Sequence, residues 1–280
     1  MSYLQNNATY SDAGGVKGPS NRFDIHAVRV MPVAKSAVAS QAIAAGMLRI
    51  VDNFASPQLG NSRKLRIYLP PGYDANPAQR YPVLYMHDGQ NLFDPGTAAF
   101  GTAWAIGATV DSLIASGAIQ PIIVVGIDNT PDRIAEYTPC CDKEHGGGKL
   151  DAYAAFLVDT VKPWVDANLR TLQDREHTAI MGSSLGGIAS VYIAQQYPQV
   201  FSRAGGVSSS FWWNDQMFSK NVPPRQPVKF YLDAGTEGDG IDFTTHMRDA
   251  MLAKGLCAER RPDVLPRRGR RPQRGLLGTA

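Results

Sequence analysis

From Tyr81 onward, short apolar runs of strand length alternate with longer segments of helical character. The runs include "YPVLYMH", "IIVVGI" and "VKFYLDAG", and the segments between them include "AWAIGATVDSLIASG" and "LDAYAAFLVDTVKPWVDANL". A chain that alternates strands with helices is expected to build a parallel sheet that helices cover on both faces. "IIVVGI" is apolar at successive positions, as a strand buried on both faces should be. The sequence therefore predicts an α/β fold with a mostly parallel central sheet flanked by helices.

Composition divides the chain into three regions. Residues 1–46 are polar, contain glycine and show no sustained periodicity, which predicts an N-terminal extension. Residues 47–255 form one predicted domain, which begins with two strands, "MLRIVDNF" and "RKLRIYLP", that are joined by a turn and are expected to pair antiparallel. Residues 256–280 are rich in Arg, Pro and Gly, so we expect an irregular basic tail there. The net charge is +3, yet residues 252–280 alone carry +6, which leaves −3 for the rest.

The segment "HTAIMGSSLGG", residues 177–187, predicts a nucleophilic serine. It contains the pattern G-x-S-x-G, in which a serine lies on a sharp turn between a strand and a helix. The flanking residues agree with this context, because "TAIM" is a short apolar run and residues 188–197 contain neither Gly nor Pro. So tight a turn leaves no room for Cβ atoms on the neighbouring residues, which explains the glycines. Ser184 is therefore the candidate nucleophile.

Loops at the carboxyl ends of the strands are candidates for the rest of the site, because ligands bind there in open α/β sheets. "HDGQNLFD" follows an early strand, and the backbone N–H groups of Gln90 and Leu185 are candidates for binding an oxyanion. "YLDAGTEGDG" offers two acids that could orient a catalytic base, Asp239 and Glu237. The aromatic pair in "SSSFWWND" either lines a substrate pocket or packs in the core (Trp212 and Trp213).

Several segments resemble one family of α/β-hydrolases, and they occur in the family's order. They are "LPPGYD", "YPVLYMHDGQNLFD", "IVVGIDNT", "EYTP", "HTAIMGSSLGG" and "SSSFWW", within a match from about Met47 to about Gly255. The family includes esterase D, feruloyl and acetylxylan esterases and the mycobacterial mycolyltransferase antigens.

This resemblance implies an α/β-hydrolase fold over residues 47–255 and a role for each candidate residue. Ser184 would be the nucleophile, and the N–H groups of Gln90 and Leu185 would form the oxyanion hole. The acid would be Asp239 if Gly235 and Thr236 are aligned, with Glu237 as the alternative. His87 would belong to the oxyanion loop beside the substrate pocket.

A base for Ser184 is not evident among the five histidines of the chain. His26 lies before the domain, and His145 lies in a Gly-rich loop. His177 lies at the end of the elbow strand opposite Ser184. His246 lies in a predicted helix seven residues after Asp239, where a surface position is the simpler interpretation, so it is a weak candidate. The resemblance implies a histidine after one more strand, in a run of the type Gly-Gly-x-His-x-Glu-x-x-Trp. The chain instead reads "LCAERRPDVLPRRGRRPQRGLLGTA", so we expect the last strand and helix to be missing or aberrant.

The composition of this tail is typical of a GC-rich coding sequence read out of frame. With wobble bases chosen to fit, residues 272–278 can be encoded by CCA-CAA-CGA-GGC-CTC-CTG-G. Omission of the first base then gives His-Asn-Glu-Ala-Ser-Trp. We therefore hypothesise that the tail is a frameshift product and that the missing catalytic histidine would stand at about position 272 in the other frame.

The sequence predicts a serine carboxylic-ester hydrolase whose catalytic histidine is absent from this chain. Two alternatives stay open: acyl transfer to a sugar or other alcohol at the same site, and a noncatalytic binding protein on a hydrolase fold. We expect a small-molecule ester as substrate and neither a metal nor an organic cofactor. The oligomeric state is not predicted.

The remaining features argue against other classes of partner. The basic tail has no aromatic residue to stack on bases, so nucleic acid is not an expected partner. No signal peptide or membrane span is evident, which predicts a cytoplasmic protein without a membrane partner. Three cysteines make no disulfide framework, so we expect free thiols at Cys140 and Cys141.

Overall fold

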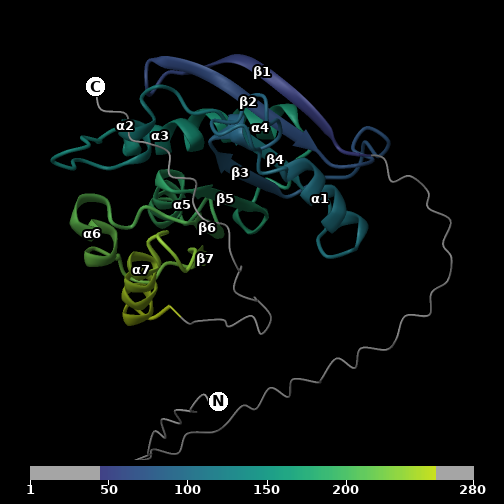
Figure 1. Cartoon of the computed structure of the whole chain (residues 1–280). Helices are drawn as coiled ribbons and strands as arrows, with labels where there is room; N and C mark the ends of the chain where they lie inside the picture. The colour runs from purple at the N-terminus through teal and green to yellow at the C-terminus, as the bar shows by residue number, and fades with distance from the viewer. Residues whose placement is uncertain (1–44, 257–280) are drawn as a thin grey trace, which may run out of the picture. The chain divides into compact units, whose positions relative to one another are not determined.

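The computed structural model describes residues 45–256 of the chain. Within this range seven strands form one sheet in the order β1-β2-β4-β3-β5-β6-β7 (Figure 1). The strands are β1 (Met47–Ser56), β2 (Asn61–Leu69), β3 (Val83–His87), β4 (Ile123–Ile127), β5 (Thr178–Ser183), β6 (Arg203–Val207) and β7 (Lys229–Asp233). β3 to β7 run parallel, whereas β2 pairs antiparallel with both β1 and β4. The predicted mostly parallel sheet and its antiparallel start are both confirmed.

Helices fill the connections between the parallel strands. They are α1 (Ile106–Ala115) after β3, then α2 (Arg133–Tyr137), α3 (Leu150–Phe156) and α4 (Lys162–Asn168) after β4, α5 (Leu185–Gln196) after β5, α6 (Trp213–Lys220) after β6 and α7 (Ile241–Ala253) after β7. A π-helical turn, η2 (Leu157–Val161), joins α3 to α4, and two short 3-10 turns, η1 (Gly89–Asn91) and η3 (Arg175–His177), follow β3 and precede β5.

Alternate strand residues enter two apolar clusters. The larger cluster takes Ile67 and Tyr85 from the sheet and packs them with residues of α3, α5 and α7. The smaller takes the next residues along the same strands, Tyr68 and Met86, and packs them with α1. Because successive side chains of a strand point to opposite faces, the two clusters lie on the two sides of the sheet. Helices therefore cover both faces, as the alternation of strands and helices predicts.

The predictions of an N-terminal extension and of a basic tail concern residues 1–44 and 257–280, which lie outside the described residues. Within the described part, α7 is the last regular element, so the prediction of an aberrant final strand and helix stays a prediction. The proposed domain boundaries stay predictions too. No helix between residues 45 and 256 has the length and apolarity to cross a membrane.

Candidate active site

Ser184 lies on the turn between β5 and α5, at the carboxyl edge of the sheet. Its backbone has φ 55° and ψ −122°, which is an unfavourable conformation for a residue with a side chain. The turn is held by hydrogen bonds on both sides: the Ser184 N–H donates to Val207 O at 3.0 Å, and the Ser210 N–H donates to Ser184 O at 3.0 Å. Such strain at a single serine between a strand and a helix is the geometry of a nucleophile elbow.

Glycines surround this turn because backbone and side-chain atoms of other residues lie too close for a Cβ atom. A Cβ on Gly182 would lie 2.7 Å from the backbone of Gly186, and one on Gly186 would lie 3.1 Å from Cβ of His87. A Cβ on Gly187 would collide with the hydroxyl of Ser209. The sequence argument that the neighbours of Ser184 must lack side chains agrees with these contacts.

The hydroxyl of Ser184 forms a hydrogen bond with the hydroxyl of Ser210, with the two oxygens 3.1 Å apart. No histidine within residues 45–256 forms a hydrogen bond with it. Each of the four described histidines has another partner: His87 with Tyr153, His145 with Asp142, His177 with Asp174 and His246 with Gln216. The weak candidate His246 therefore points to α6 and not to the nucleophile.

The oxyanion candidates lie on two segments that touch. Leu185 is the first residue of α5, so its N–H belongs to the first turn of a helix, where backbone donors have no intrahelical acceptor. Gln90 lies in η1, and Gly89 separates it from Asp88. His87 and Asp88 pack on the elbow, since a Cβ on Gly186 would lie 3.5 Å from the Asp88 carboxylate and 3.1 Å from the side chain of His87.

His87 is buried, with 2% of its surface exposed, and does not face an open pocket. Its Nδ1 lies 2.9 Å from the hydroxyl of Tyr153, and its ring packs against those of Tyr137 and Tyr153. Burial lowers the pKa of His87 to about 4, since desolvation disfavours the charged imidazolium. His87 is therefore a buried, neutral residue that packs against the glycines of the elbow, whereas the sequence predicted a place in the substrate pocket.

Asp239 and Glu237 have different surroundings. The Oδ2 atom of Asp239 accepts hydrogen bonds from the Ser208 hydroxyl at 2.7 Å and from the Gly235 N–H at 2.6 Å. Glu237 is exposed to solvent. Ser208 and Ser210 belong to the same segment after β6, so this segment contacts both the candidate acid and the nucleophile.

The two tryptophans separate into a buried and an exposed residue. Trp213 is 1% exposed and belongs to the core, whereas Trp212 is 39% exposed. The ring of His145 packs against both, with centroids 5.6 Å from Trp212 and 5.9 Å from Trp213. Of the pair, Trp212 alone presents a substantial surface to a ligand.

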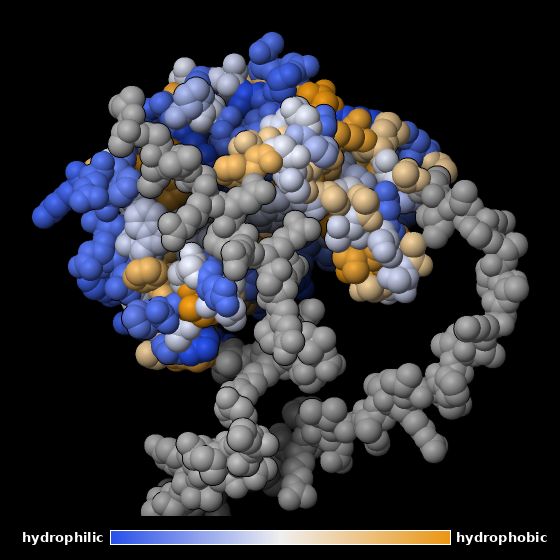
Figure 2. Space-filling model, in the orientation of Figure 1, coloured by the Kyte–Doolittle hydropathy of each residue, from blue (hydrophilic) through white to orange (hydrophobic). Residues whose placement is uncertain are grey.

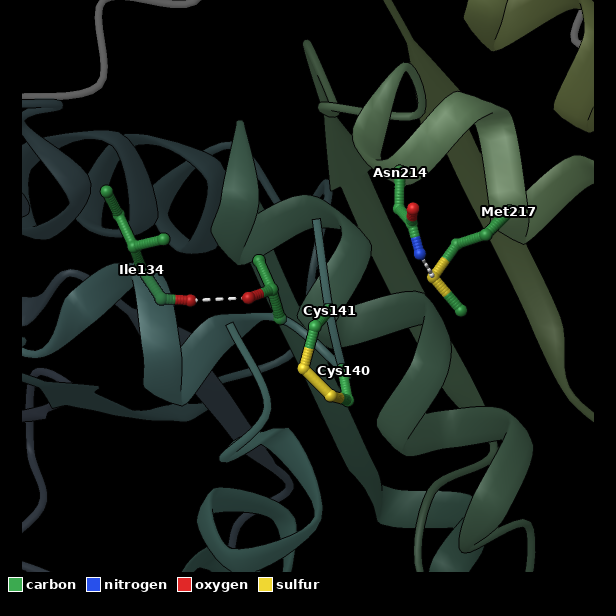
Figure 3. The surroundings of a disulfide bond; sticks show 6 residues. Ile134, Cys140, Cys141, Asn214 and Met217 are labelled. Carbon is green, nitrogen blue, oxygen red and sulfur yellow. Dashed lines mark hydrogen bonds between the residues drawn. A yellow bond between two sulfur atoms is a disulfide. The ribbon is translucent and has the colours of Figure 1, made fainter. Parts of the chain in front are cut away.

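His145 lies in the loop between α2 and α3, which is hydrophilic and reaches the left edge of the view in Figure 2. In this loop Cys140 and Cys141 are joined by a disulfide (Figure 3), so the expectation of free thiols is wrong at these two residues. Cysteine spacing predicts disulfides that close a loop of the chain, so it does not predict a disulfide between adjacent cysteines. No three His, Cys, Asp or Glu side chains between residues 45 and 256 come together as a potential metal site.

Sequence reasoning missed the polar residues that hold this site together. The serines of "SSSFWW" contact Ser184 and Asp239, although the segment drew attention only for its tryptophans. Arg133 and Asn129 bind the carboxylate of Asp88, beside the oxyanion candidate Gln90. Asn129 lies inside the run "IVVGIDNT", and Arg133 lies between this run and "EYTP". In the sequence these runs indicated only a family resemblance.

Comparison with known proteins agrees with this geometry. A family model described as "Putative esterase" matches residues 56–261. An endo-1,4-beta-xylanase/feruloyl esterase of Xylanibacter ruminicola is 30% identical over 74% of this chain and 27% of its own length. The iron(III) salmochelin esterase of Escherichia coli is 29% identical over 70% of this chain and 48% of its own length. The chain thus spans less than half of either of these relatives.

A solved ferulic acid esterase has the same fold. It superposes with a TM-score of 0.60 at 20% sequence identity, over 76% of this chain and 88% of that structure. The strand order, the elbow and the family match agree with one another, and the chain belongs to this esterase family of α/β-hydrolases.

Proposed function

We propose that the chain is a serine carboxylic-ester hydrolase in which Ser184 is the nucleophile. The observation that carries the proposal is the backbone of Ser184, which has φ 55° and ψ −122° between β5 and α5. Evolution retains such strain where a side chain must be presented to a substrate. Membership of an esterase family supports the same chemistry.

In the proposed reaction, the Ser184 hydroxyl attacks the carbonyl carbon of an ester and forms a tetrahedral intermediate. The N–H groups of Gln90 and Leu185 donate to its oxyanion, and collapse releases the alcohol and leaves an acyl-enzyme that water hydrolyses. Asp239 is the proposed acid, because the Ser208 hydroxyl and the Gly235 N–H fix its carboxylate. No described residue is assigned to accept the Ser184 proton and pass it to the leaving alcohol, since no histidine between residues 45 and 256 forms a hydrogen bond with the Ser184 hydroxyl.

The substrate is proposed to be a small-molecule ester. One relative is named a feruloyl esterase and another an iron(III) salmochelin esterase, and these names favour an ester of this class for the present chain. Trp212 offers an exposed aromatic surface near Ser210, the hydrogen-bond partner of the nucleophile.

The second candidate is a binding protein with little turnover. It is favoured by the contact of Ser184 with Ser210 in place of an imidazole. A serine hydroxyl without a base is a weak nucleophile, so such a chain would bind an ester and cleave it slowly.

Hydrolysis of a short series of p-nitrophenyl esters, together with labelling by a fluorophosphonate, tests the proposal. Ser184→Ala should abolish labelling and reduce hydrolysis to the rate of the oxyanion hole alone. Ser116→Ala, on the exposed end of α1, is the matched control and should behave as the original chain. Full activity in Ser184→Ala would refute the assignment, whereas ester binding with no Ser184-dependent labelling would favour the second candidate.

A further inference from the structure

Asp88 begins the oxyanion loop, residues 88–90, in a conformation that its side chain must stabilise. Its φ is 56° and its ψ is 48°, in the left-handed region that a residue with a Cβ adopts at a cost. The side chain is 9% exposed. A carboxylate removed from water in this way requires charged or polar partners.

Arg133 supplies the main partner for this carboxylate. Its Nε lies 2.7 Å from Oδ1 of Asp88 and its Nη2 lies 2.8 Å from Oδ2, which makes the pair bidentate. Asn129 adds a third hydrogen bond, from Nδ2 to Oδ1 at 2.6 Å. Two parallel bonds from a planar guanidinium fix direction as well as distance, and a lysine ammonium cannot reproduce them.

The rest of the oxyanion loop is tied to the same region of the chain. The Asp88 N–H donates to the hydroxyl of Tyr137 at 3.1 Å, and the Asn129 N–H donates to Oε1 of Gln90 at 3.1 Å. The guanidinium of Arg133 also lies over the ring of Tyr137, 5.1 Å from its centroid. The two hydrogen bonds join residues 88–90 to the segment from Asn129 to Tyr137, and the contact of Arg133 with Tyr137 lies within that segment.

The same carboxylate also lies beside the elbow, because its Oδ2 would be 3.5 Å from a Cβ on Gly186. The loop is thus held between the elbow and the segment that carries Arg133. We propose that Arg133 is a positioning residue, which through Asp88 sets the place of the Gln90 N–H relative to Ser184. This inference rests on the proposed function.

Turnover is the first test, with Arg133→Lys as the variant that keeps the charge and loses the bidentate geometry. Loss of one oxyanion donor costs about 100- to 1000-fold in kcat, so a displaced donor should cost about tenfold or more. KM for the same p-nitrophenyl ester should change by less than about threefold, because the donor acts mainly on the transition state. Lys149→Ala is the control: it removes the exposed ion pair with Asp132 near the same helix and should leave kcat unchanged.

Hydrogen exchange of the backbone is the second test, and it does not require turnover. Peptides covering residues 87–93 should exchange about tenfold faster in Arg133→Lys than in the original chain or in Lys149→Ala. Asn129→Ala, which removes one bond to Asp88, should change kcat and exchange in the same direction by a smaller factor. It provides the readout if Arg133→Lys fails to fold.

The two tests separate the inference from the function on which it rests. A chain with no Ser184-dependent hydrolysis contradicts the proposed function, and faster exchange in Arg133→Lys would then still support the clamp on the loop. Exchange that is unchanged in Arg133→Lys overturns the inference, and so does an unchanged kcat in a protein that hydrolyses esters through Ser184. A loss of kcat matched by an equal rise in KM also overturns it.

Discussion

The hydroxyl oxygen of Ser184 lies 3.1 Å from the hydroxyl oxygen of Ser210, and no histidine between residues 45 and 256 forms a hydrogen bond with it. A second alcohol can orient the first, but it cannot remove its proton near neutral pH, because a neutral alcohol is a very weak base. The described residues therefore orient the proposed nucleophile but supply no histidine to activate it.

The first prediction is that this chain is a slow esterase and that a frame-corrected version is a fast one. Returning the tail to the other frame, with a histidine at about position 272, should raise kcat by about 100-fold or more, as general base catalysis does. The rate is measured with p-nitrophenyl esters on both proteins, and mutation of the restored histidine to alanine should remove the gain.

The coding DNA provides an independent check of this prediction. The shifted reading requires the wobble bases A, A and A at Pro272, Gln273 and Arg274. Any other base at these positions contradicts the frameshift hypothesis. Rapid ester hydrolysis by the chain as it stands would contradict the prediction that its catalytic histidine is missing.

The second prediction identifies the acid. In the frame-corrected protein, Asp239→Asn should lower kcat by about 10⁴-fold, the loss seen when a triad acid can no longer support an imidazolium. Glu237→Gln should change kcat by less than about twofold, because Glu237 is an exposed carboxylate, whereas Ser208 and Gly235 fix Asp239. Kinetics of the two variants side by side decide between the acids, and a larger loss in Glu237→Gln would reverse the assignment.

The local parts of this site could be predicted from the sequence. The elbow occupies consecutive residues, and its glycines record a steric requirement that applies wherever a strand turns sharply into a helix. Strand and helix periodicity likewise depend on neighbouring residues, so the parallel sheet and its antiparallel start could also be predicted.

Contacts between distant residues could not be predicted in this way. Asp88 and Arg133 are 45 residues apart, and Ser184 and Ser210 are 26 apart, so no periodic pattern relates them. The burial of His87 depends on Tyr137 and Tyr153, which reach it from α2 and α3. Such pairs become neighbours only once the helices pack on the sheet.

The third prediction concerns the glycines of the elbow. Gly182→Ala should lower the free energy of unfolding by about 1–3 kcal/mol, since its Cβ would lie 2.7 Å from the backbone of Gly186, which cannot move without distorting the turn. Gly107→Ala in α1 is the matched control: its Cβ would meet Tyr68 at an ordinary 3.6 Å, and alanine favours a helix over glycine. Urea unfolding of both variants measures the difference, and equal stabilities would show that the elbow tolerates a side chain.

The fourth prediction is a dependence of stability on pH that arises from His87. Burial lowers its pKa from 6.5 to about 4, so the folded protein holds the imidazole neutral, while the unfolded chain takes up a proton below about pH 6.5. The contribution to stability is therefore complete above pH 6.5 and is lost as the pH falls from 6.5 toward 4. A shift of this size corresponds to about 3 kcal/mol in the free energy of unfolding.

His87→Asn tests this prediction, because asparagine can keep a hydrogen bond to Tyr153 and has no titrating group in this range. Unfolding by urea at pH 7.0, 5.5 and 4.5 should show a shallower loss of stability in His87→Asn than in the original chain. His246→Asn is the control for the loss of an imidazole, since His246 forms its hydrogen bond to Gln216 at an exposed site. Buried carboxylates such as Glu136 are common to all three proteins and cancel in the comparison. If stability falls equally with pH in His87→Asn and in the original chain, the pKa of His87 is the same in the folded and unfolded states and the prediction is wrong.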